Sequence, residues 1–135
     1  MATIKKFGDL EIWQLASDLA NNIFEIYKSN PAFQKDFKLW DQINGSSGSV
    51  MDNIAEGFER GSRNEFINFL SFAKGSAGEV KSQLYRARHR NYFSIEDFDI
   101  LYEKTDKVGN KIGKFIGYLN KSTFKGSKFK ERSRI

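Results

Sequence analysis

His89 is the residue around which catalysis would have to be built, because the chain of 135 residues has one histidine and no cysteine. A Ser-His-Asp arrangement needs a serine and a carboxylate held around that single imidazole, and no nucleophile-elbow pattern occurs in the sequence. Arg86, Arg88 and Arg90 flank His89, which indicates a basic helix end rather than a general base. We therefore expect no catalytic residue and no enzymatic activity.

The sequence also offers little to a metal ion or a bound phosphate. A di-iron site in a helical bundle uses paired Glu-x-x-His motifs, whereas an arginine stands at the glutamate position relative to His89. The small residues 45–49 lack both the Lys-Ser/Thr of a P-loop and a preceding strand pattern. Asp52, Glu56 and Glu59 share one helix face without firm partners elsewhere, which favours a solvated or intersubunit surface. We expect no metal, no cofactor and no small-molecule substrate.

Positive charge is concentrated in two stretches of the chain, whose net charge is +5. Residues 60–90 hold seven basic and two acidic side chains, and residues 121–135 hold six and one. Within the first stretch, Lys74, Lys81 and Arg88 recur at seven-residue steps, each directly after an apolar position. Such a stripe flanks the seam of a helix. It either pairs with acidic side chains of an adjacent helix or faces the phosphates of a nucleic acid.

The candidate nucleic-acid contacts are the basic residues of these two stretches. Lysines spaced along a terminal tail with two phenylalanines suit a phosphate backbone and stacked bases. Basic tails also serve as solubilising ends, and both interpretations stay open. The candidates are Arg60, Arg63, Lys74, Lys81, Arg86, Arg88, Arg90, Lys121, Lys125, Lys128, Lys130, Arg132 and Arg134.

Helices must position these residues, because four stretches place apolar residues at three- and four-residue steps. The expected helices cover about 10–29, 37–58, 63–90 and 95–120. The third has the strictest heptad spacing. Amphipathic helices joined by short turns favour antiparallel neighbours. The sequence predicts an all-α protein, an antiparallel up-down four-helix bundle over residues 1–120, followed by a disordered basic tail over 121–135.

Local signals set the expected helix boundaries. Asp9 is the expected N-cap of the first helix, and Asn30-Pro31 ends that helix because the residue before a proline is pushed out of the α region. The small residues 45–49 suggest a loop by composition, but periodicity on both sides predicts a continuous helix. Ser62, with a glutamate three residues later, forms a capping-box signature that begins the third helix.

The sequence gives no sign of export or membrane insertion. It has no cysteine for disulfides, and its N-terminal segment lacks a continuous apolar stretch with a small-residue cleavage pattern. No run reaches the eighteen or so apolar residues that span a bilayer. We expect a cytoplasmic protein without a membrane partner.

Five motifs occur in order along about residues 7 to 120. They are Leu10-Glu11-Ile12-Trp13-Gln14, Asp41-Gln42-Ile43, Asn53-Ile54-Ala55-Glu56-Gly57, Ser62-x-x-Glu65-Phe66-x-x-Phe69-Leu70 and Ala73-x-Gly75-Ser76-x-x-Glu79-x-x-x-Gln83-Leu84. Each motif is weak alone, but together they form a specific pattern. The pattern resembles the bacterial four-helix-bundle family of 23S rRNA intervening-sequence proteins.

The resemblance implies an up-down four-helix bundle that assembles as a ring-shaped homopentamer. It also implies a gene within sequences inserted into large-subunit ribosomal RNA genes of some bacteria. The chain is more distantly similar to accessory bundle proteins of diversity-generating retroelements, which are pentameric and bind nucleic acid and a reverse transcriptase. Asn44, Gly45, Ser46 and Ser47 stand where the family usually has arginine and alanine, so any function of those arginines is weakened here.

Two functions follow from the sequence. The first is a non-enzymatic, homo-oligomeric bundle that binds RNA through the third helix and the tail. The alternative is a homo-oligomeric scaffold or protein-interaction module without nucleic-acid binding, in which the charges serve subunit pairing. The acidic first two helices and the basic third helix motivate this alternative, because complementary surfaces favour head-to-tail contacts.

Overall fold

The computed structural model describes residues 4–121, which form five α-helices, one 3-10 turn and no strand. The prediction of an all-α chain is confirmed. The elements are η1 (Phe7–Asp9), α1 (Glu11–Lys28), α2 (Pro31–Lys35), α3 (Phe37–Glu59), α4 (Arg63–His89) and α5 (Ile95–Lys121). The four long helices α1, α3, α4 and α5 correspond to the four stretches of apolar periodicity.

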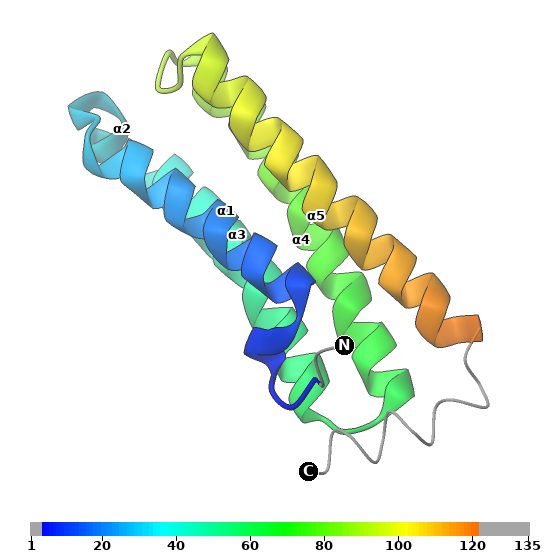
Figure 1. Ribbon diagram of the computed structural model, residues 1–135. Helices are drawn as coiled ribbons and strands as arrows, with labels where there is room; N and C mark the ends of the chain where they lie inside the picture. Colours follow the sequence, from blue (N-terminus) through cyan, green and yellow to red (C-terminus); the bar gives the residue numbers. More distant parts are fainter. Residues whose placement is uncertain (1–3, 122–135) are drawn as a thin grey trace.

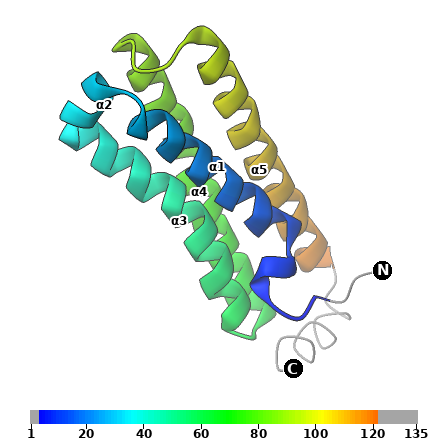
Figure 2. The same ribbon diagram turned by 60° about the vertical axis from the view of Figure 1, so that its left-hand side comes forward.

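The four long helices lie side by side around a shared core (Figures 1 and 2). α1 packs against α3 and α5, and α4 packs against the same two helices, so α3 and α5 occupy opposite corners. We call the two sides of α4 its α3 edge and its α5 edge. No helix within residues 4–121 has the length and apolar character needed to cross a membrane.

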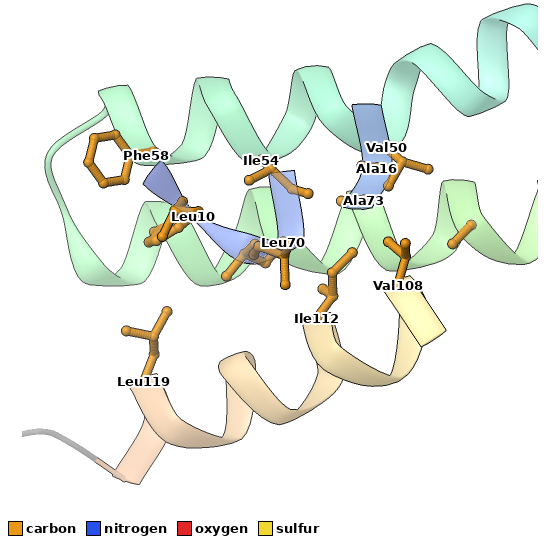
Figure 3. Packing of buried hydrophobic residues seen from close by; sticks show 13 residues of the cluster. Leu10, Ala16, Val50, Ile54, Phe58, Leu70, Ala73, Val108, Ile112 and Leu119 are labelled. Carbon is orange, nitrogen blue, oxygen red and sulfur yellow. The ribbon is translucent and has the colours of Figure 1, made fainter. Parts of the chain in front are cut away.

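Two clusters of buried apolar side chains fill the space between the helices. Figure 3 shows the first, to which Ala16 of α1, Ile54 of α3, Leu70 of α4 and Ile112 of α5 contribute. The second surrounds Phe33 near the α2 end of the molecule. The heptad residues of α4 are all buried, as their spacing predicts: Phe66, Leu70, Ala73, Ala77, Val80, Leu84 and Ala87.

The short helix α2 was not predicted from the sequence, in which Asn30-Pro31 indicated only a helix stop. The same pair also starts a helix. Asn30 Oδ1 accepts a hydrogen bond from the Phe33 amide at 3.0 Å, and proline at the first helical position lacks an amide that would need a partner. Asn30 Nδ2 donates to the Tyr92 carbonyl at 2.9 Å, and Phe33 stacks on the Tyr92 ring. The turn thereby ties the α1 end to the α4–α5 connection.

Three other boundaries test the local signals. The expected N-cap Asp9 is wrong: Leu10 holds that position, and Asp9 Oδ2 instead accepts hydrogen bonds from the Lys5 and Lys6 amides, because a 3-10 turn precedes α1. Residues 45–49 are helical, as predicted, within an uninterrupted α3. Ser62 Oγ accepts from the amide of the third residue after it at 3.4 Å, which confirms Ser62 as the N-cap of α4.

Candidate nucleic-acid interface

The basic stripe of α4 faces α5 of the same chain. Lys81 Nζ lies 2.5 Å from Asp106 Oδ1, and the Arg88 guanidinium lies over the Phe98 ring at 4.9 Å. The pairing interpretation therefore holds for Lys81. Its partner belongs to α5, however, and not to the acidic first two helices that the charge distribution suggested.

The hydrogen bond between Lys81 and Asp106 shifts both groups toward their charged forms. It raises the pKa of Lys81 and lowers the pKa of Asp106 from their ordinary values. The Lys81 ammonium also lies 5.3 Å from the centre of the Tyr102 ring. Both side chains are partly exposed, so solvent screens the attraction between them and the pair contributes little to folding. Lys81 is thus engaged in joining α4 to α5.

Lys74 differs from Lys81 because its charge has no carboxylate partner among residues 4–121. Its stem crosses Gly113 of α5, where an added Cβ would lie 3.2 Å from Lys74 Cε. The stem packs against α5 while the ammonium reaches solvent, which is the usual behaviour of a long basic side chain. Lys74 therefore stays available to an external anion.

Arg60 and Arg63 stabilise the turn between α3 and α4. The Arg60 guanidinium lies 3.6 Å from a Glu56 carboxylate oxygen and 3.8 Å from one of Glu65. Arg63 Nη1 donates to the Leu119 carbonyl at 2.9 Å. That carbonyl belongs to the last turn of α5, where carbonyls lack helical partners. Both arginines thus have structural partners within the chain.

Arg86 and Arg90 also contact α3 or the residue that caps it. Arg86 Nη1 donates to Gln42 Oε1 at 2.8 Å, and Arg90 Nη1 donates to Asp36 Oδ2 at 2.8 Å. Asp36 is the N-cap of α3 and also accepts from Tyr92 Oη at 2.9 Å. Burial acts to raise the pKa of Asp36, but these hydrogen bonds and that from the Leu39 amide outweigh it and lower the pKa.

The tail candidates fall mostly outside the described residues. Lys121 is exposed and is the last residue of α5, one residue beyond the expected helix end. The other five candidates of the tail lie outside residues 4–121: Lys125, Lys128, Lys130, Arg132 and Arg134. The basic tail thus continues the chain directly from the C-terminal end of α5.

α5 carries two further lysines that are not among the candidates predicted from the sequence. Lys107 and Lys114 precede Lys121 at seven-residue steps, and all three are exposed. None of the three has a carboxylate partner among residues 4–121. From Lys107 to Lys121 the sequence contains no aspartate or glutamate. Their seven-residue spacing is a signal that the sequence contains, although basic residues are denser in α4.

The other two lysines of this half of α5 face α1. Lys111 Nζ lies 2.9 Å from Glu11 Oε1, and Lys104 Nζ lies 2.9 Å from Asp18 Oδ2. Lys104 also contacts Asn22 Oδ1. Rotation around the helix therefore separates paired lysines, which hold α1, from unpaired lysines, which face solvent. The unpaired cations of α5, together with Lys74, form what we call the α5 cationic surface: Lys74, Lys107, Lys114 and Lys121.

The fold and this surface define an all-helical protein with a cationic outer edge. Within residues 4–121, no group of three or more histidine, aspartate or glutamate side chains could hold a metal ion. Residues 8–114 match the family model described as 23S rRNA-intervening sequence protein, and the chain belongs to this family.

A solved structure supports the same assignment. It is a protein of unknown function from the S23 ribosomal protein family of Bacteroides thetaiotaomicron VPI-5482. That structure matches with a TM-score of 0.72 and 26% sequence identity, over 78% of this chain and 97% of the other. Among curated proteins the chain has no match.

Proposed function

We propose that this protein is a non-enzymatic RNA-binding protein that assembles with copies of itself, and that the exposed α5 lysines Lys107, Lys114 and Lys121 and the basic tail contact the RNA. The observation that carries the proposal is the stretch from Lys107 to Lys121, which contains no aspartate or glutamate and whose three exposed lysines have no carboxylate partner among residues 4–121. The family name refers to 23S rRNA, and the solved relative belongs to a ribosomal protein family. Both support RNA as the polyanion.

The spacing of the lysines suits a phosphate backbone. Residues seven apart on a helix lie about 10 Å apart along its axis, so Lys107, Lys114 and Lys121 extend positive charge over about 20 Å. Lysines that neutralise phosphates release counterions, and this release drives RNA binding at low salt. Unlike Lys81, Lys104 and Lys111, these three need not break an ion pair with the protein to reach a phosphate.

The proposed assembly is a homo-oligomer of antiparallel up-down four-helix bundles in the cytoplasm. The resemblance to intervening-sequence proteins points to a ring-shaped pentamer. Contacts of α1 and α4 with both α3 and α5 support the bundle arrangement. Repetition of the α5 cationic surface around a ring would let several copies engage one RNA, which raises the overall affinity.

Binding of a labelled RNA stem-loop tests the proposal. We expect the wild-type chain to bind at about 50 mM salt and much more weakly at about 200 mM. The variant K107Q/K114Q/K121Q should bind about tenfold more weakly or worse. K35Q/K38Q removes two exposed lysines near the α2 end and serves as a control that should bind almost normally. Absence of binding at low salt, or equal reductions in affinity for both variants, would contradict the proposal.

The alternative function is a homo-oligomeric scaffold without nucleic-acid binding. Its support is the presence of Asp41, Asp52 and Glu59 on exposed positions of α3, without cationic partners among residues 4–121. α3 lies at the corner opposite α5, so the two unpaired sets suit contacts between copies. If the scaffold function is correct, K107Q/K114Q/K121Q should change the mass of the assembly. Neither this variant nor the wild type should then bind RNA.

A further inference from the structure

A groove of about 610 Å³ runs along the α3 edge of α4, away from the α5 cationic surface. Small and polar side chains line it, and none of its lining residues within the described part of the chain is a bulky apolar one. Its principal lining residues are Asp41, Gly45 and Ser49 from α3 and Glu79, Gln83 and Arg86 from α4.

Gln83, in the groove, has an incompletely satisfied amide. The side chain is 7% exposed, and Nε2 donates to Ser46 Oγ at 3.0 Å. Its Oε1 has no hydrogen-bond partner among residues 4–121. Leaving a buried acceptor without a hydrogen bond is destabilising, because the group loses its water without gaining a partner. A donor from another molecule in the groove would remove this cost.

No contact among residues 4–121 explains why position 45 holds glycine. Gly45 lies inside α3, where glycine is less favourable than alanine because it loses more backbone freedom on folding. A Cβ built at Gly45 would meet nothing within 4 Å. At Gly57, by contrast, a Cβ would lie 2.7 Å from Phe69 Cβ, so packing within the subunit requires that glycine. Close approach of a second helix from outside gives Gly45 a reason.

The charges at the two edges of α4 are complementary. Asp41 and Glu79 in the groove have no cationic partner among residues 4–121. On the α5 edge, Lys74 and Arg88 have no carboxylate partner within the same range, although Arg88 stacks on Phe98. A chain with unpaired acids on one edge and unpaired bases on another favours head-to-tail contacts between copies.

We propose that the groove on the α3 edge of α4 is the docking surface for a second copy of this chain. The α5 edge of that copy enters the groove, bringing Lys74 and Arg88 toward Asp41 and Glu79 and a hydrogen-bond donor toward Gln83. The inference rests on the homo-oligomer proposed above and adds which surfaces meet. Because the two surfaces differ, the contact is heterologous and repeats from copy to copy.

Light scattering on matched glycine variants tests the docking surface. A Cβ at Gly45 meets nothing within 4 Å, so the indole ring of G45W can extend into the groove, and we expect a folded monomer where the wild type is an oligomer. G45A adds a methyl group that meets nothing within 4 Å inside the subunit, so it should keep the fold and lower the assembled mass less than G45W does. If tryptophan disturbs folding, as helical circular dichroism would show, E79K at an exposed position serves instead and should also lower the mass.

Mixing distinguishes a head-to-tail contact from a symmetric one. G45W retains the α5 edge, and K74E/R88E retains the groove, so an equal mixture of these two monomers should form dimers with one intact contact. If the wild type is an oligomer and G45W or E79K has the same mass, the proposed docking surface is wrong and the proposed assembly stands. Two monomers that stay apart on mixing overturn the pairing of the two edges. A monomeric wild type overturns the proposed assembly and the docking surface together, while RNA binding is measured separately.

Discussion

Glycine at position 57 shows how the neighbours of a residue, and not its type, decide its role in this chain. A Cβ there would lie 2.7 Å from Phe69 Cβ and 3.0 Å from Phe66 Cδ1, whereas at Gly45 it would meet nothing. Both residues lie within α3 and both carry the same cost in helix propensity. Only the contacts across the helix interface distinguish them.

We therefore expect G57A to destabilise the protein and G45A to stabilise it. Overpacking costs about 1–3 kcal/mol, and the gain in helix propensity of about 1 kcal/mol offsets part of that cost at position 57. At position 45 the propensity gain stands alone. Urea unfolding of the two variants and the wild type measures the difference. A G57A variant as stable as G45A would show that the close approach of α3 and α4 is wrong.

Asp36 gives a pH dependence with a defined sign. Its folded pKa lies below the ordinary value of 3.8, so its contribution is complete above about pH 4 and is lost as pH falls through the lowered folded pKa. D36N keeps an N-cap acceptor but no charge. We expect D36N to lower the free energy of unfolding by roughly 1–2 kcal/mol at pH 7 and by less at pH 2. A gap between wild type and D36N that is independent of pH would contradict this role.

The partner of each charged side chain was not predictable from the sequence. Lys81 was a candidate contact for phosphates, but helix rotation and the register between α4 and α5 place it on Asp106. Likewise Arg63 caps the α5 end through Leu119, a residue far away in the sequence. Composition located the charge, but it did not say which charges the fold neutralises.

Two sides of the helix α5 have different roles. Lys104 and Lys111 face acidic residues of α1, while Lys107, Lys114 and Lys121 face solvent. The apolar residues between them form the buried side of the helix. One helix therefore joins α1 to the bundle and presents cations outward.

Neutralising the paired lysines should affect stability and not RNA binding. We expect K104Q/K111Q to lower the free energy of unfolding by up to about 1 kcal/mol per ion pair, with the effect shrinking at high salt. Its affinity for an RNA stem-loop should exceed that of K107Q/K114Q/K121Q. Urea unfolding and RNA titration of the same preparations measure both effects. If K104Q/K111Q proved the weaker RNA binder, the assignment of the two sides of α5 would be reversed.

Long elements were predictable because their signal repeats. The heptad of α4 recurs over many turns and matches its buried side. The small residues 45–49 also followed the periodicity around them. α2 and the 3-10 turn η1 are too short to show a period, and hydrogen bonds of single side chains define them. These bonds depend on contacts that the sequence does not display.

For the molecule as a whole, unpaired charges of each sign gather on separate stretches of the surface. Among residues 4–121, exposed acids without a cationic partner lie on α3 and in the first half of α5, and cations without a carboxylate partner lie in the second half of α5 and on the adjacent edge of α4. This distribution suits contacts between copies and contact with RNA, provided that different cations serve each. We assign Lys74 and Arg88 to the contact between copies, and the outer lysines of α5 with the tail to RNA. In the proposed assembly, Lys74 lies in the contact between copies, and Lys107, Lys114 and Lys121 remain available to RNA.

The dependence of RNA affinity on salt tests the central claim most directly. The slope of log K against log[salt] becomes shallower by about 0.7–0.9 for each phosphate that the protein no longer neutralises, so K107Q/K114Q/K121Q should differ from the wild type by about 2–3 in slope. K35Q/K38Q should keep the wild-type slope. Equal slopes for the wild type and the α5 triple variant, or no wild-type binding at low salt, would contradict RNA binding through α5.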